Sequence, residues 1–342
     1  STSTIYRRKT SEISCSFALL RWTLSSSGNF LGIWAKLMER VARFAMGGPL
    51  AAISAVLFFL LLGFLFAPFF VISSAIIALV TLRQGYSEGL KIAISASVLY
   101  CGFSILAFNQ SLISIVFPLM MWLPLVMLAY PLRQSQNYHF SFVLIALLML
   151  GYSLLFRVIV VDLQGFWINK IQAVVDIISA GAALDFSASQ VRYLSGQIHI
   201  WWLIFIECTL IVTLFYARYL QSKLYNPGGF AEEFKKIQLS RFWLWLLLVV
   251  IIFNVFQRAG GSELPLTGDL LAILLVFFSL QGLSVVHFRN HMQGLSVGWL
   301  VGLYVFLFLV PQVVGFILAV TGIFDTLTDF RTLRKISDEK DE

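Results

Sequence analysis

The sequence predicts an all-α fold, a polytopic bundle of eight to ten transmembrane helices. Apolar stretches of about 15 to 30 residues recur from Gly48 to Phe324, and short loops between them hold nearly all the charge. A stretch of about 20 apolar residues crosses a hydrocarbon layer of about 30 Å as a helix. Because these stretches do not alternate between apolar and polar residues, they lack the pattern of a transmembrane β-barrel.

Composition supports this fold class. The 342-residue chain is 59% hydrophobic and 12% charged, whereas soluble domains have about 25% charged residues. Its net charge is +7, but the Lys and Arg residues are spread over several loops, so we expect no nucleic acid partner. Cys15, Cys101 and Cys208 lack the spacing of metal ligands, and neither a metal site nor a disulfide framework is expected. The lipid bilayer is the expected partner.

The chain divides into three parts. Residues 1–47 contain seven basic and two acidic residues, so the positive-inside rule places this tail in the cytoplasm. Residues 1–37 are Ser-rich and precede Met38, which favours an over-called start codon; a genuine cytoplasmic extension is the alternative. Residues 48–324 form the expected transmembrane domain, and residues 325–342 form a charged C-terminal tail.

Eight membrane segments are expected before the last apolar stretch. Their predicted bounds are Gly48–Phe66, Pro68–Leu82, Leu90–Phe108, Ser111–Tyr130, Phe140–Ile159, Ile198–Ala217, Phe242–Phe256 and Leu266–Phe288. The second is short, so its depth in the membrane stays open. The stretch 295–324 is either one helix or two short helices that turn back at Pro311. We favour two helices, because proline breaks or kinks a helix and the basic tail then stays in the cytoplasm.

Two polar regions lie between the expected spans. Residues 160–196 are predicted as an outer helical segment, either an interfacial helix packed on the bundle or a lid over an outward-facing pocket. Residues 218–241 are predicted as an inner loop with a turn, followed by an amphipathic surface helix. The loop residues expected to contact a membrane or a partner are Tyr225, Asn226, Pro227, Gly228, Gly229, Phe230 and Phe234.

A few polar residues within the apolar stretches are candidates for function. Glu207 lies near the middle of the sixth expected span, where an acid is costly and marks a functional site or a buried partner. It is either protonated or faces a polar cavity with Asn254, Gln281 or His287. Near span ends, Asp269 and Arg157 are interpreted as side chains that reach the interface. No catalytic residue or cofactor motif is recognised, so an enzyme is not expected.

Five segments resemble the YybS-like family of bacterial multi-pass inner-membrane proteins, to which no activity is assigned. They are LVTLRQGYSEGL (79–90), YNPGGFAEEFKKIQL (225–239), FFSLQGLSVVH (277–287), GWLVGLYV (298–305) and GIFDTLTDFR (322–331). The resemblance implies a location in the bacterial cell inner membrane. A weaker architectural likeness links the early hairpin to the substrate-binding subunits of energy-coupling-factor transporters, without a matching vitamin-binding motif.

Two functions are compatible with these features. A small-molecule binding or transport protein predicts a membrane-embedded pocket lined by polar groups such as Glu207, Asn254 and Gln281. A non-transporting scaffold that recruits cytoplasmic or envelope partners predicts a filled bundle core and a groove at the inner surface, near residues 218–241.

Overall fold

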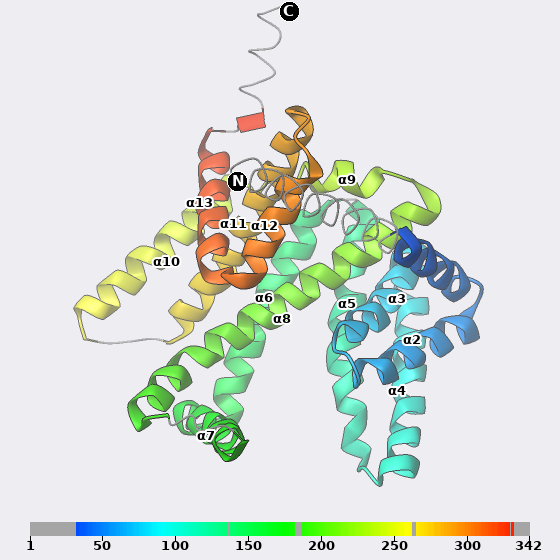
Figure 1. The fold of residues 1–342 in the computed structure, drawn as a ribbon, viewed down its shortest axis with the longest axis horizontal. Coiled ribbons are helices and arrows are strands. Elements are labelled where there is room, and N and C mark those ends of the chain that lie inside the picture. Colours follow the sequence, from blue (N-terminus) through cyan, green and yellow to red (C-terminus); the bar gives the residue numbers. More distant parts are fainter. Residues whose placement is uncertain (1–31, 136, 182–185, 262–264, 329, 332–342) are drawn as a thin grey trace, which may run out of the picture.

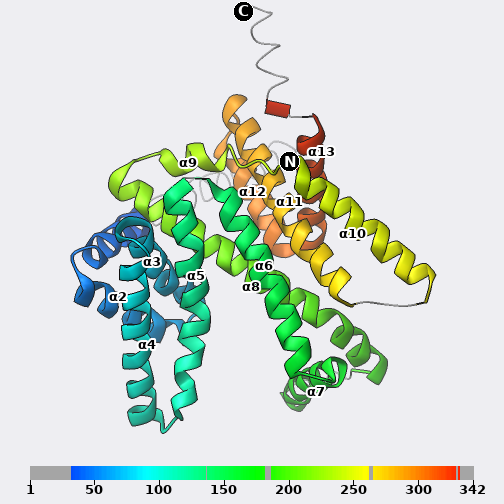
Figure 2. The ribbon, with the colours of Figure 1, turned by 180° about the vertical axis from the view of Figure 1, so that it is seen from behind.

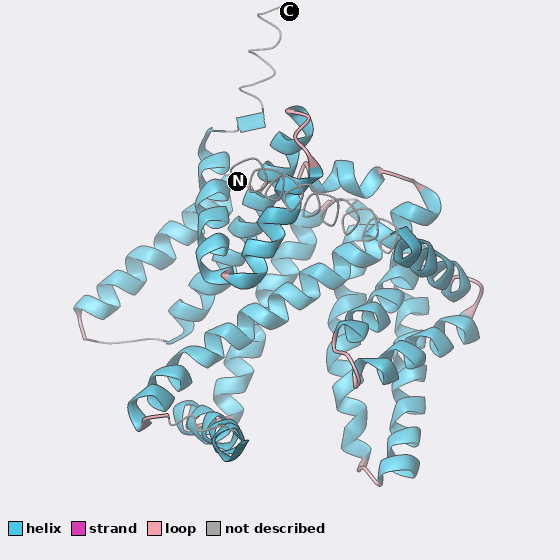
Figure 3. Ribbon diagram, in the orientation of Figure 1, coloured by secondary structure: helices cyan, strands magenta, loops and turns pink. Residues whose placement is uncertain are grey.

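A computed structural model describes residues 32–135, 137–181, 186–261, 265–328, 330 and 331. Within these ranges every regular element is a helix (Figure 3), which confirms the all-α prediction. Residues 1–31 of the expected N-terminal tail, which include most of the segment 1–37 assigned to an over-called start, lie outside the described residues, as do residues 332–342 of the C-terminal tail.

The first half of the chain forms a helical layer. Residues 32–45 are helical, and their exposed apolar side chains include Ile33, Trp34 and Phe44. The helices that follow are α2 (Pro49–Gly63), α3 (Pro68–Gln84), α4 (Tyr86–Phe108), the short η1 (Leu112–Ile115) and α5 (Val116–Ser135). α3 is the most enclosed of them, because eleven consecutive buried side chains begin at Ile72 and end at Leu82.

The second half surrounds two long helices. Its elements are α6 (Tyr138–Ile159), α7 (Leu163–Gly181), α8 (Ala188–Tyr225), α9 (Gly229–Phe234), α10 (Arg241–Ala259), α11 (Pro265–Met292), α12 (Val297–Leu309) and α13 (Pro311–Thr328). α11 is flanked by α6, α8, α10 and α13, and more of it is buried than of any other candidate span.

Seven of the described helices are long and apolar enough to cross a membrane: α4, α5, α6, α8, α10, α11 and α13. α2, α3 and α12 are apolar but have only 15, 17 and 13 residues. At 1.5 Å per residue, α12 is about 20 Å long and shorter than the hydrocarbon layer. The chain therefore has the helices of a multi-pass membrane protein, while the larger count of eight to ten spans stays a prediction.

The molecule has two ends, which we name after the helices that lie there. The long helices run between an α9 end and an α7 end (Figures 1 and 2). The start of α4, the start of α6, α9 and the end of α13 lie toward the α9 end. The start of α5, the end of α10 and the start of α13 lie toward the α7 end.

The helical pattern expected for residues 160–196 belongs to two helices. These residues contain α7 and the first turns of α8, which begins at Ala188 and not near Ile198 as expected. Ser187 caps this helix: its Oγ accepts a hydrogen bond from Gln190 N, and Gln190 Oε1 accepts one from Ser187 N. This reciprocal cap fixes an early start. α8 therefore has 38 residues, about 57 Å of helix, and crosses the molecule at a tilt (Figure 1).

The predicted break at Pro311 is confirmed. α12 ends at Leu309 and α13 begins with Pro311 at its first position, where the missing N–H of proline costs nothing. The two helices form a hairpin whose tip lies toward the α7 end (Figure 1). The end of α13 consequently returns to the α9 end of the molecule.

α13 packs on α11 through glycine, and this is the most extensive helix contact of the described chain. A Cβ built on Gly282 would overlap the carbonyl of Leu318, and one on Gly322 would overlap the carbonyl of Phe278. Ser279 Oγ also donates to Gly315 O at 2.8 Å. Small residues permit this approach of two backbones, which drives helix association where lipid provides no hydrophobic contrast.

Candidate functional site

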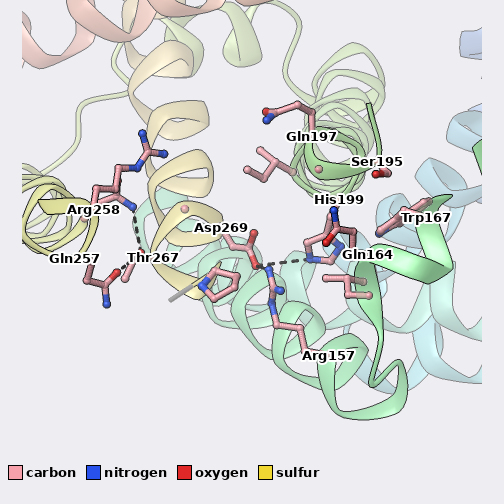
Figure 4. A pocket seen from close by; sticks show the side chains of 16 residues that line it. Arg157, Gln164, Trp167, Ser195, Gln197, His199, Gln257, Arg258, Thr267 and Asp269 are labelled. Carbon is pink, nitrogen blue, oxygen red and sulfur yellow. Dashed lines mark hydrogen bonds and ion pairs between the residues drawn. The ribbon is translucent and has the colours of Figure 1, made fainter. Parts of the chain in front are cut away.

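The α7 end contains a polar pocket of about 510 Å³ (Figure 4). Five helices meet there: the end of α6, the start of α7, the start of α8, the end of α10 and the start of α11. The lining residues are Arg157, Leu163, Gln164, Trp167, Ser195, Gly196, Gln197, His199, Ile200, Asn254, Gln257, Arg258, Pro265, Thr267, Gly268 and Asp269. We refer to this as the polar pocket.

Asp269 is the centre of the polar pocket. Its side chain is 1% exposed, and its Oδ2 lies 2.6 Å from Arg157 Nη2 and 3.6 Å from His199 Nε2. Ser153 Oγ donates to the same oxygen at 2.5 Å. Figure 4 shows that Arg157, His199 and Asp269 point toward one another from three different helices. A buried carboxylate is tolerated when a cation and hydrogen bonds compensate its lost hydration.

Several buried polar atoms around this ion pair have no hydrogen-bond partner among the described residues. They are Arg157 Nε, Trp167 Nε1 and His199 Nδ1, while His199 Nε2 faces Asp269 Oδ2 at 3.6 Å. An N–H group that is buried without an acceptor costs about 1 to 3 kcal/mol. The side chains of these three residues line the polar pocket, while the nitrogens themselves are covered by neighbouring atoms.

A chain of neutral polar groups continues the lining toward α10. Asn254 Nδ2 donates to Thr267 Oγ1 at 3.1 Å, and Thr267 Oγ1 donates to Gln257 Oε1 at 3.0 Å. These bonds join the end of α10 to the start of α11. Asn254, one of the four expected site residues, therefore belongs to the polar pocket.

The interpretation of Arg157 and Asp269 as separate interfacial side chains is wrong. The two are an ion pair between α6 and α11, and Asp269 is buried. The sequence offered one signal for this pair. Arg157 and Asp269 are an isolated base and an isolated acid, and both lie near the end of an expected span on the outer side of the membrane. An ion pair lowers the free-energy cost of placing both charges in the membrane. This gain is not visible when each residue is considered alone.

Glu207 lies elsewhere. Its side chain on α8 is fully buried, and neither carboxylate oxygen has a hydrogen-bond partner among the described residues. It lines neither the polar pocket nor the second cavity described below. Neither of these two cavities joins Glu207 to Asn254, Gln281 or His287.

Gln281 joins α11 to the segment after α9. Its Oε1 accepts hydrogen bonds from Leu239 N at 3.0 Å and from Thr326 Oγ1 at 3.2 Å, and its Nε2 donates to Asp325 Oδ2 at 2.7 Å. All of these groups are buried. Gln281 therefore has a structural role: it accepts the hydrogen bond of the Leu239 backbone N–H, which lies outside any helix.

Arg331 extends this polar junction at the α9 end. Its guanidinium group donates to the backbone carbonyls of Lys235 and Ile237 at 2.7 and 2.8 Å, and it lies 3.3 Å from Asp325 Oδ2. Ser284 Oγ donates to Phe234 O at 2.7 Å. The chain after α9 is thus held against α11 and α13 through its own carbonyl groups.

His287 lines a second cavity, a groove of about 750 Å³ at the α9 end. Its Nε2 forms a 2.8 Å hydrogen bond with Tyr304 Oη on α12. Lys223 and Lys235 also line this groove. The hydrogen bond from Lys235 lowers the pKa of Glu232, which is solvent-exposed beside it. We refer to this cavity as the α8–α12 groove.

The loop 218–241 is only partly a surface feature. Tyr225, Asn226, Pro227 and Gly228 are exposed, and Gly228 has a φ of +90°, which favours glycine. Gly229 begins α9, and a Cβ there would overlap the Asn226 side chain. The turn that the sequence predicts is therefore present.

Phe230 and Phe234 pack on neighbouring helices and also line the α8–α12 groove. Phe234 is buried, with its ring centroid 5.7 Å from that of Phe215 and 5.1 Å from that of His287. Phe230 is half-buried and also packs on Phe215. The apolar face of α9 was assigned to a membrane or partner surface because sequence periodicity does not specify what covers it. In the fold, α8 and α11 cover it.

Within the part of the chain that the structure describes, no three His, Cys, Asp or Glu side chains lie close enough together to hold a metal ion. Comparison with protein-family models, with curated proteins and with solved structures finds no match to this chain. Membership of the YybS-like family and the likeness to transporter subunits stay predictions.

Proposed function

We propose that the chain is a multi-pass membrane protein that binds a small polar solute with an anionic group in the polar pocket. The observation that carries this proposal is a polar cavity built around the buried Arg157–Asp269 ion pair. Arg157, Trp167, His199 and Arg258 line this cavity of about 510 Å³. Ligand pockets typically have volumes of about 300 to 1,000 Å³ and a few convergent polar groups.

The charge of the lining favours an anionic solute. Among its described residues, the pocket has two guanidinium groups, Arg157 and Arg258, and one carboxylate, Asp269. One positive charge therefore remains after the Arg157–Asp269 pair is formed. A carboxylate or phosphate group would accept hydrogen bonds from such donors, and charge-assisted bonds of this kind are stronger than neutral ones.

The orientation proposed for the protein places the α9 end in the cytoplasm. Basic residues are concentrated there, at the ends of α3, α5, α8 and α11 and in the segment after α9: Arg83, Arg133, Arg218, Lys223, Lys235, Lys236, Arg241 and Arg289. Cytoplasmic loops carry the excess of Lys and Arg. The polar pocket then opens outward, and the end of α13 is cytoplasmic. A bacterial inner membrane is proposed from the family resemblance alone.

Ligand-induced stabilisation tests the proposed binding. The purified protein would be unfolded by heat with 10 mM glycerol 3-phosphate, succinate or glutamate, and with lysine as a cationic comparison. A solute at 100 times its Kd stabilises a protein by about 2.7 kcal/mol. We expect at least one of the anionic solutes to raise the Tm and lysine to have no effect.

The matched variants localise the effect. Gln164→Leu with Gln197→Leu changes two exposed lining residues outside the ion pair, and this variant should lose the stabilisation. Gln172→Leu with Gln293→Leu changes two exposed glutamines away from the pocket and should keep it. The proposal is contradicted if the solute stabilises both double variants equally. It is also contradicted if no solute stabilises the wild type.

The runner-up is a scaffold that recruits a partner through the turn Tyr225–Gly228. One observation favours it, since all four residues are exposed at the α9 end. Gly228→Val forces a β-branched residue to a φ of +90°, a conformation that such residues resist. If the scaffold function is correct, this change removes the cellular function and leaves the solute-induced Tm shift unchanged.

A further inference from the structure

The α8–α12 groove has the composition of a lipid site. Its walls are apolar where α8, α11 and α12 face each other, with Val212, Phe215, Leu283 and Leu300 among the lining residues. Its volume of about 750 Å³ is as large as that of a ligand pocket.

α12 leaves this groove accessible from the side. None of its residues is buried, and the helix packs mainly on α13. Large apolar side chains of α12 and of the facing part of α8 are exposed, including Val212, Val301 and Val305. In a membrane-spanning chain, an open apolar groove between such helices is in contact with acyl chains.

Only the α9 end of the groove is charged. Lys223 and Lys235 line it there, together with His291. Lys235 Nζ forms an ion pair with Glu232 at 2.6 Å, and Lys223 Nζ lies 5.6 Å from the Tyr219 ring centroid. The two lysines and one glutamate leave a positive charge.

We propose that the α8–α12 groove binds one anionic phospholipid of the bilayer. An acyl chain lies between α8 and α12, and the phosphate lies at the end that Lys223 and Lys235 line. The separation of an apolar wall from a basic end matches the two parts of such a lipid, and basic residues at the membrane surface attract anionic lipids. This proposal is independent of the solute proposed for the polar pocket.

The test is a native mass spectrometry titration of the delipidated protein with dioleoyl-phosphatidylglycerol and, separately, dioleoyl-phosphatidylcholine. We expect the phosphatidylglycerol to bind at least 10-fold more tightly. Lys223→Gln with Lys235→Gln should weaken its binding about 30-fold, equivalent to about 2 kcal/mol from two surface cations. Binding of phosphatidylcholine should change by less than about threefold.

The chain offers a matched control for these two lysines. Lys91 forms an ion pair with Glu88 three residues away, as Lys235 does with Glu232. Lys170 lies over the Phe166 ring, as Lys223 lies over Tyr219. Lys91→Gln with Lys170→Gln therefore removes the same charge and the same interactions outside the groove. An equal loss of affinity in this control, or equal binding of the two lipids by the wild type, overturns the proposal.

A second pair of variants tests the acyl chain. Val212→Trp places a large side chain in the groove, whereas Val249→Trp places one on an exposed position of α10. We expect the first to weaken binding of both lipids at least 10-fold and the second to leave it unchanged. Unchanged lipid binding by Val212→Trp overturns the proposal. The proposal is also overturned if the wild type is a dimer that Val212→Trp dissociates, because a second copy of the chain would then occupy the groove.

Discussion

The two ends of the molecule use buried polar residues differently. At the α9 end, Gln281 and Arg331 bond to backbone groups of the chain after α9 and to Asp325, so polar side chains join helices to each other. The buried Asp325 Oδ1 and Asn290 Oδ1 lack a described partner there. At the α7 end, Arg157, His199 and Trp167 retain buried nitrogens without a described partner beside a cavity. The first arrangement satisfies buried polar groups, whereas the second leaves buried N–H groups unsatisfied, which costs stability.

The largest expected effect tests the packing that supports the α9 end. Gly322→Val places a side chain against the Phe278 carbonyl of α11, so the two helices must separate. We expect a loss of about 3 kcal/mol or more, measured by thermal or denaturant unfolding and by cellular abundance. Gly302→Val on α12, where a Cβ meets no atom within 4 Å, is the control and should change stability little. Equal loss in both variants would mean that valine acts through helix propensity.

The second prediction concerns the ion pair of the polar pocket. Asp269→Asn removes the negative charge and leaves the partly buried Arg157 uncompensated, which should destabilise the protein by about 3 kcal/mol. Adding Arg157→Gln should restore part of this loss. A double-mutant cycle measured by unfolding gives the coupling free energy, and a coupling near zero would show that the pair does not stabilise the fold.

Gln281→Leu separates the two ends further. It removes the acceptor of Leu239 N and the partner of Asp325, and leaving these buried groups unsatisfied should cost about 2 kcal/mol. The Tm shift induced by an anionic solute at the α7 end should persist, because Gln281 is outside the polar pocket. If that shift disappears, the two ends are energetically coupled.

The smallest expected change in stability comes from Glu207, which belongs to neither cavity. Its buried carboxylate oxygens have no described partner, so Glu207→Leu should stabilise the protein by about 1 kcal/mol. Glu207→Gln keeps the shape and removes the titratable group; if Glu207 carries a proton or cation for transport, this variant should stay folded and lose function. A folded, fully active Gln variant would remove Glu207 from any transport mechanism.

The sequence by itself determined the helical fold, the apolar spans and the places where helices end. Long apolar stretches produce helices wherever water is absent, and local signals such as Pro311 and Gly228 act through the backbone of their own neighbours. These features depend on residues close together in the chain. The bounds were less accurate for α8, which runs from Ala188 to Tyr225 where a span from Ile198 to Ala217 was expected.

Only the tertiary structure decided which polar residues meet. Asp269 and Arg157 are 112 residues apart in the chain and form an ion pair, whereas Glu207, Asn254, Gln281 and His287 occupy separate environments. Helix periodicity specifies the face on which a residue lies, but the tilt of α8 and the glycine contact of α11 with α13 determine which faces come together. The apolar face of α9 shows the same limit, because an amphipathic pattern does not distinguish a membrane surface from the protein interior.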